Sequence, residues 1–130
     1  MQANPEEIET YQVQNGDLLV SEGGDSGRSA IVDKINFDCI IQNHVHRLRP
    51  LNGSSSGYLL HALRSIKESG WFDVLTKRVT MNNLPSLTLA NMKIPIPSEK
   101  EQHDIYDFLQ KETKQFDDLI SKSQSQINLL

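Results

Sequence analysis

The sequence Ile94-Pro95-Ile96-Pro97-Ser98-Glu99-Lys100-Glu101-Gln102 joins two physically different parts of the chain. Its two prolines lack a backbone N–H and bias the residues before them to extended geometry, which predicts a strand end or a stiff extended segment. Ser98 and Glu101 have the spacing of a capping box, in which each side chain binds a backbone amide of the other's turn. The stretch therefore predicts a boundary between a mixed domain over residues 1–97 and a helix over residues 98–130.

Apolar residues continue beyond this stretch at a helical spacing. Leu109 and Phe116 are seven residues apart, as are Ile120 and Ile127, and a step of four joins the two pairs. This spacing is typical of a coiled coil, although polar residues interrupt a strict seam. The helix is longer than a small domain needs, so we predict that these residues form a seam with a helix of the same assembly or of a second copy. The alternative is a helix that lies on its own domain.

Strand and helix patterns both occur before the boundary, and they predict an α+β fold with a β-rich core and one packed helix. The apolar residues within 58–69 recur at a spacing near 3.6, which predicts a helix capped by Ser56 and stopped by Gly70. The other expected elements are strands over residues 11–13, 18–21, 28–33 and 39–48, loop and strand over 71–80, and a turn or short helix leading into a strand edge over 84–94.

Length and composition favour one domain with a helical appendage. The chain has 130 residues and contains no apolar run of the length, about 18 residues, that spans a membrane. Its N-terminus lacks the basic start and apolar stretch of a signal peptide, so we expect a cytoplasmic protein. The single cysteine, Cys39, excludes an internal disulfide framework and a cysteine-rich metal site, and we expect it to be a small buried side chain.

The charges are unevenly distributed along the chain. The net charge of −4 argues against a nucleic-acid partner, but residues 44–93 carry seven basic groups and only two acidic ones. Residues 1–43 carry two basic and eight acidic groups, and residues 94–130 carry four and seven. A cationic middle between acidic ends can bind a polyanion through its local field. The alternative is that these are ordinary solvated charges.

A glycine-rich stretch at residues 23–29 contains Arg28. It fails the pattern of a phosphate-binding P-loop, because its outer glycines are one residue too close, arginine stands in place of lysine, and a strand is expected to follow. A glycine-rich turn with an arginine at its exit can still contact a phosphodiester. A simple hairpin turn is an equal alternative.

Residues with metal-binding or catalytic chemistry form no convincing set. His44 and His46 share one face of a predicted strand, but no third ligand stands at a helpful spacing, so we expect no metal site. His61 and His103 lie on predicted helices far apart in the sequence. No catalytic triad order, carboxylate pair or cofactor fingerprint stands out. We therefore expect a protein that is not an enzyme and needs no cofactor.

A compact polar and basic cluster lies at residues 77–83. Arginine can recognise guanine, asparagine can recognise adenine, and lysine or threonine can hold phosphate. Asparagine before Leu84-Pro85 is also typical of a turn. From this chemistry and from their expected loop positions, the candidate DNA-binding residues are Arg28, Lys77, Arg78, Asn82 and Asn83.

Short motifs follow one another along nearly the whole chain. They are Gly16-Asp17-Leu18-Leu19, the glycine turn from Gly23 to Arg28, Ala30-Ile31-Val32, the strand from Gln42-Asn43 to Arg49-Pro50, Tyr58-Leu59, the region from Thr80 to Leu84, and Ile-Pro-x-Pro-x-x-x-Glu-Gln-x-x-Ile at residues 94–105. In this order they resemble the specificity (S) subunit of type I restriction-modification systems. The last motif is the most specific of them.

The resemblance implies a function and a set of partners. Such subunits carry two target recognition domains, each of which recognises one half of a split double-stranded DNA sequence. Their long helices pair as an antiparallel coiled coil that sets the spacing of the two halves. They perform no chemistry, but bind methyltransferase subunits and, through these, restriction subunits. The resemblance implies that this chain is the C-terminal part of one recognition domain with its spacer helix, either as a fragment or as the product of a truncated gene.

Two other functions stay open at this point. The chain could be a truncated assembly module that pairs through its C-terminal helix and binds no DNA of its own. It could also be the specificity segment of a fused restriction-methyltransferase, in which another domain carries the reaction.

Overall fold

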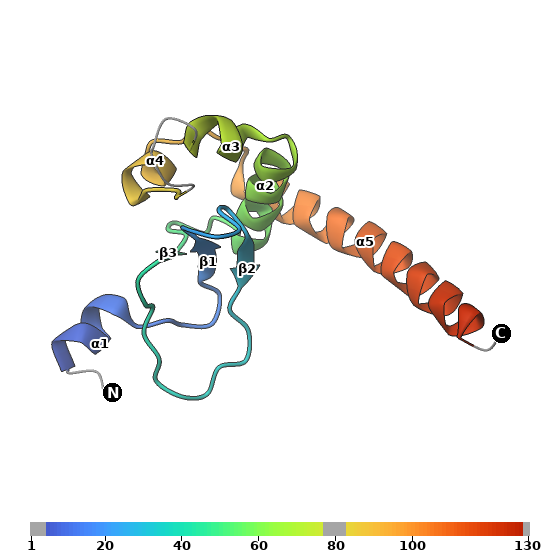
Figure 1. Cartoon of the computed structure of the whole chain (residues 1–130), viewed down its shortest axis with the longest axis horizontal. Helices are drawn as coiled ribbons and strands as arrows, with labels where there is room; N and C mark the ends of the chain where they lie inside the picture. The colour runs from blue at the N-terminus through green and yellow to red at the C-terminus, as the bar shows by residue number, and fades with distance from the viewer. Residues whose placement is uncertain (1–4, 77–82, 129–130) are drawn as a thin grey trace.

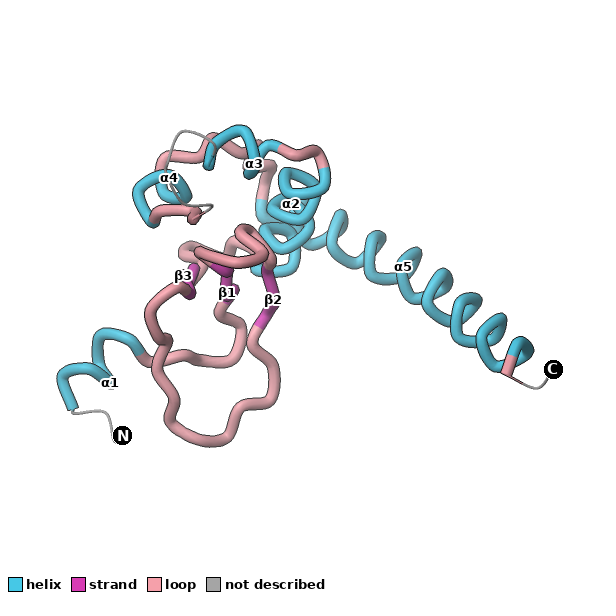
Figure 2. The backbone as a smooth tube through the Cα atoms, viewed as in Figure 1, coloured by secondary structure: helices cyan, strands magenta, loops and turns pink. Residues whose placement is uncertain are grey.

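A three-stranded antiparallel sheet lies at the centre of the computed structural model, which describes residues 5–76 and 83–128 (Figure 1). β1 (Leu18–Ser21) is the middle strand, and β2 (Ser29–Ile31) and β3 (Val45–Leu48) pair with it on either side. A long loop joins β2 to β3 and extends away from the helix at residues 56–68, on the side where the N-terminal helix lies (Figure 2).

Helices make up most of the remaining described structure. The helix α2 (Ser56–Glu68) contacts β1, β2, α3 (Trp71–Thr76) and α5 (Glu99–Ile127), so it connects the sheet to the C-terminal helix. This mixture of an antiparallel sheet and helices confirms the predicted α+β fold. In chain order the helices are α1 (Pro5–Tyr11), α2 (Ser56–Glu68), α3 (Trp71–Thr76), α4 (Ser86–Ala90) and α5 (Glu99–Ile127).

The apolar core lies between the sheet and α2. Leu18 and Val20 alternate along β1 and so point to the same face, where both are fully buried. Leu18 stands opposite Ile31 and Leu48 on the two neighbouring strands, and both of these pack against the core. The buried cluster consists of Leu18, Val20, Leu60, Leu63, Phe72 and Leu84.

The strand predictions outside β1 were partly wrong. Residues 11–13 form no strand: α1 ends at Tyr11, and Gln12 makes only an isolated bridge to Ile40. Pro5 is the first residue of α1, where its fixed φ suits a helix and its missing N–H has no cost. The strand expected over residues 39–48 begins only at Val45, because His44 has φ +72° and turns the backbone out of extended geometry.

The helix predictions were correct for α2 and incomplete elsewhere. The cap of α2 is Ser55 rather than Ser56, since the Ser55 hydroxyl accepts from the Tyr58 amide at 3.2 Å. Gly70, at φ +77°, follows the end of α2 as expected. Residues 71–76 form α3 instead of loop and strand, and this helix buries Phe72 in the core. Residues 77–80 lie outside the described structure.

The segment between α4 and α5 forms no strand edge. Residues 93–97 belong to no helix or strand, because two prolines remove amides that a ladder would need. The short helix predicted before this segment is confirmed as α4. Cys39, expected to be buried, is half-buried in the β2–β3 loop.

α5 begins at the predicted capping box. The Ser98 amide donates to Glu101 Oε2 at 3.0 Å, and the Glu101 amide donates to Ser98 Oγ at 3.4 Å. The helix has 29 residues and is therefore about 43 Å long. Beyond its first turns it leaves the domain (Figure 1). Of the predicted seam residues, Leu109 is half-buried, whereas Phe116, Ile120 and Ile127 are more than half exposed. In this structure α5 therefore does not lie along its own domain, and pairing with another helix stays a prediction.

No helix in the described part of the chain has the length and apolar character needed to cross a membrane.

Candidate nucleic-acid interface

The loop between β1 and β2, residues 22–28, is a tight turn that we call the glycine loop. Gly24 and Gly27 adopt φ of +70° and +81°, which only glycine takes without strain. Within the loop the Gly27 amide donates to the Ser21 carbonyl at 2.9 Å, and the Ser26 hydroxyl donates to the Glu22 carbonyl at 2.8 Å. The glycine loop thus joins neighbouring antiparallel strands, as the hairpin alternative predicted, and it has a defined shape.

Side chains from helices distant in sequence hold the glycine loop in place. Lys67 of α2 donates through Nζ to the Ser26 carbonyl at 3.0 Å and to the Asp25 carboxylate. The hydrogen bond from Lys67 lowers the pKa of Asp25, so this carboxylate is ionised at neutral pH. Phe72 of α3 packs directly over Gly27. The loop is therefore fixed to the core on its α2–α3 side.

The chain that leads into α4 holds the opposite side of the glycine loop. The Leu84 amide donates to the Glu22 carbonyl at 2.6 Å, and its own carbonyl lies 2.7 Å from Nε2 of His46. Asn83 lies beside Gly23, with its Oδ1 only 3.0 Å from the position that a Cβ on Gly23 would occupy. Residues from β3, the glycine loop and the start of the α4 segment therefore meet at one surface.

The predicted DNA-binding residues fall into two groups. Arg28 is exposed at the exit of the glycine loop, and Asn83 lies against Gly23 near the start of the same loop. Lys77, Arg78 and Asn82 lie outside the described residues. The contacts of Lys67 with the glycine loop and of His46 with Leu84 were missed, because the partners lie about 40 residues away in the sequence.

The histidines do not form the metal site that their spacing permitted. His44 lies in a turn before β3, so it does not share a strand face with His46. His44 Nδ1 instead lies 3.4 Å from the Glu22 carboxylate. Among the described residues, no three histidine, cysteine or acidic side chains are grouped as metal ligands would be.

Part of the cationic middle of the chain is used inside the fold. Arg49 donates to both oxygens of the buried Asp17, with Nε and Nη2 at 2.6 and 2.7 Å. Arg47 donates to the backbone carbonyls of Gln12 and Thr10. Arg47 and Arg49 therefore stabilise the N-terminal segment, and the field available to an outside polyanion is smaller than the charge count predicts.

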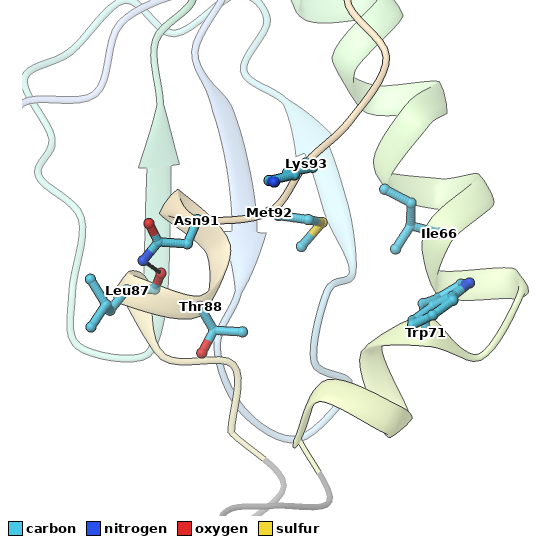
Figure 3. A pocket seen from close by; sticks show the side chains of 7 residues that line it. All are labelled: Ile66, Trp71, Leu87, Thr88, Asn91, Met92 and Lys93. Atoms are coloured by element: carbon cyan, nitrogen blue, oxygen red, sulfur yellow. Dashed lines mark hydrogen bonds between the residues drawn. The ribbon is translucent and has the colours of Figure 1, made fainter.

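A cavity of about 610 Å³ lies between the α2–α3 corner and α4 (Figure 3). Its lining is mostly apolar, and Lys93 is its charged residue. The amide of Asn91 is already occupied, because its Nδ2 donates to the Leu87 carbonyl at 2.8 Å. The cavity thus has no set of converging acid, base or nucleophile. Its lining residues are Ile66, Trp71, Leu87, Thr88, Asn91, Met92 and Lys93.

These features define a small α+β domain with a tightly held glycine loop and a long projecting helix. The sequence profile of the type I restriction modification DNA specificity domain matches residues 2–129. The chain belongs to this family.

A solved structure agrees with this assignment. A chain from a study of complex assembly and conformational transition in the type I R-M system superposes with a TM-score of 0.69 at 25% sequence identity. The match covers 84% of this chain and 26% of that one, so this chain spans about a quarter of the length of its structural relative. No curated protein matches the sequence.

Proposed function

We propose that this chain recognises double-stranded DNA as part of the specificity subunit of a type I restriction-modification complex. The family match over residues 2–129 is the observation that carries the proposal. In this proposal residues 1–97 form part of a target recognition domain and residues 98–130 form the spacer helix. The glycine loop would face the DNA, because it is rigid, ends in the exposed Arg28 and lies beside Asn83.

The proposed division of labour places catalysis in other subunits. The chain would bind a methyltransferase subunit and, through it, a restriction subunit, in the cytoplasm where the DNA is. The family match over residues 2–129 supports this division.

Arg28→Ala tests the DNA-binding surface. If Arg28 holds a phosphate, its removal should weaken binding to every sequence alike and reduce the slope of log K against log salt by about one. If it contacts a base, the loss should be about 1–3 kcal/mol and should relax preference at one position. The measurement is a titration of duplex DNA into the methyltransferase complex at several salt concentrations.

Lys122→Ala is the matched control for this titration. It removes one positive charge from an exposed position near the far end of α5, so it should leave affinity and salt slope unchanged. Equal losses for both variants would show a general charge effect. No loss for Arg28→Ala would remove this residue from the proposed interface.

The second candidate function, assembly through the helix, is favoured by the exposed apolar residues of α5. Phe116 and Ile120 are 64% and 56% exposed although both are large and apolar. Exposed apolar stripes of this kind are typical of partner contacts. In this candidate the chain pairs with another specificity chain or a second copy and binds no DNA of its own.

Ile120→Asp tests the pairing of α5. A charge placed in an apolar seam should abolish helix-mediated self-association, as measured by analytical ultracentrifugation over a range of concentrations. Ser121→Asp is the control, because it adds the same charge at the next exposed position, which points to another face of the helix. A wild-type chain that stays monomeric, or equal effects of the two variants, would contradict pairing through this seam.

A further inference from the structure

The amide side chain of Gln102 joins three segments of the chain. Gln102 lies in the first turns of α5 and is only 1% exposed, although it is polar and every neighbouring residue of that turn is exposed. Its Oε1 accepts from the Ser55 amide at 3.0 Å, and its Nε2 donates to the Pro97 carbonyl at 2.9 Å. One side chain therefore connects the N-cap of α2, the proline segment and α5.

Close backbone packing fixes the same junction. A Cβ on Gly57 of α2 would lie 2.3 Å from the ring of Tyr106, so this side chain of α5 rests directly on the backbone of α2. The Tyr58 hydroxyl donates to the Pro95 carbonyl at 2.8 Å. Ser55, Gly57 and Tyr58 all lie at the N-cap and first turn of α2, so this one end of α2 holds the proline segment through Pro95 and α5 through Gln102 and Tyr106.

The length of α5 makes its direction important. The helix runs about 38 Å beyond Gln102, and every residue from Thr113 to Asn128 is exposed. A change of about 10° in its axis at the junction would move the far end by about 7 Å, which is about two base-pair steps of a duplex. A loose junction would therefore broaden the distribution of any distance that the helix sets.

We propose that Gln102 is a positioning residue that fixes the direction of α5, and through it the spacing between the two DNA half-sites. The spacing part of this inference rests on the proposed DNA-recognition function. The buried amide suits the role better than the capping box does, because the capping box closes only the end of α5, whereas Gln102 connects α5 to α2. Its two hydrogen bonds have defined directions, which apolar packing lacks.

The direct test measures the junction in the whole chain without DNA. Spin labels are placed on α2 at Arg64→Cys and on α5 at Ser121→Cys, in a Cys39→Ser background, and the doubly labelled chain is diluted into unlabelled chain. We expect one narrow distance distribution for the wild-type junction and a distribution broader by several ångström for Gln102→Leu, which removes both hydrogen bonds at similar volume. An unchanged width for Gln102→Leu would overturn the proposal.

Two further variants separate positioning from folding. Gln124→Leu makes the same chemical change at an exposed position on α5 and should keep the narrow distribution. Gln102→Glu keeps an acceptor for the Ser55 amide, but it loses the donor to Pro97 and buries a carboxylate beside that carbonyl, so it should also broaden the distribution. If Gln102→Leu does not fold, the width for Gln102→Glu decides: a narrow distribution equal to wild type overturns the proposal.

The functional test uses the assembled methyltransferase complex and duplexes of its selected target whose spacer is lengthened or shortened by one base pair. We expect Gln102→Leu to weaken the preference for the native spacer by about tenfold, which corresponds to about 1.4 kcal/mol, while each half-site sequence stays preferred. If Gln102→Leu broadens the distance distribution but the wild-type complex binds no DNA, the proposed function is rejected and the positioning role of Gln102 is kept. If the complex binds DNA but Gln102→Leu changes neither the width of the distance distribution nor the spacer preference, the role of Gln102 is rejected and the proposed function is kept.

Discussion

Gly27→Ala is expected to lower the free energy of unfolding by about 3 kcal/mol, from two effects that act together. Gly27 has φ +81°, where a side chain strains the backbone, and its added Cβ would lie 2.5 Å from the ring of Phe72. Phe72 is only 2% exposed and belongs to the core, so it has no room to move away. Denaturant unfolding followed by circular dichroism measures the change.

Gly24→Ala separates the two effects. Gly24 lies in the same loop at φ +70°, but no atom lies within 4 Å of an added Cβ. Its substitution should therefore cost only the backbone strain, about 1 kcal/mol. The difference between the two variants measures how tightly α3 packs over the glycine loop. Equal losses would contradict that packing, and with it the rigid shape proposed for the DNA-facing surface.

Asp17→Ala is expected to cost about 2–3 kcal/mol of folding stability. Asp17 is 1% exposed and accepts two hydrogen bonds from Arg49 and one, at 2.7 Å, from the Gln14 amide. Removal leaves the part-buried backbone amide of Gln14 without this acceptor, whereas the partly exposed Arg49 can turn to water. The expected loss is therefore below that of a fully buried pair.

Asp33→Ala is the matched control. Asp33 faces Lys34 at 3.5 Å with both side chains largely exposed, so its removal should change stability by less than the error of the measurement. Equal effects of Asp17→Ala and Asp33→Ala in parallel denaturant titrations would contradict the structural role of the Asp17–Arg49 pair.

The Asp17–Arg49 pair also predicts an acid-dependent loss of stability. Burial alone would raise the pKa of Asp17, but the hydrogen bond from Arg49, the Gln14 amide and the charges of Arg49 and Arg47 outweigh it and lower the pKa below 3.8. The stabilisation is therefore present above pH 3.8 and is lost as the pH falls through the lowered value. Asp17→Asn should remove this part of the pH dependence.

Features that depend on neighbours in sequence could be predicted. The capping box at Ser98 needs two residues at a spacing of three, and β1 needs an alternating run between turn signals. Both lie where the sequence places them. α2 was also predictable, because its apolar spacing persists over several turns and Gly70 follows it.

Features that depend on contacts far apart in sequence could not be predicted. The ion pair of Asp17 and Arg49 spans 32 residues, and the hydrogen bond from Ser55 to Gln102 spans 47. A glutamine on an otherwise exposed turn carries no local sign that it is buried. α3 was missed because tertiary packing of Phe72 in the core overrides the strand preference of its neighbours.

Several of the motifs that identify the family contribute residues that hold the fold together. The Gly-Asp motif contributes Asp17 and the Arg-Pro motif contributes Arg49, and the two meet in one ion pair. The Glu-Gln motif contributes the capping box and the buried Gln102. These motifs therefore report the scaffold.

Selection of duplexes from a randomised library by the methyltransferase complex containing this chain tests the central claim most directly. The account predicts enrichment of a defined half-site sequence, with binding that weakens as salt is raised. The complex with Arg28→Ala should show weaker enrichment than the complex with Lys122→Ala. Absence of any enriched sequence with the wild-type chain, while the complex remains assembled, would contradict DNA recognition by this chain and favour a role in assembly alone.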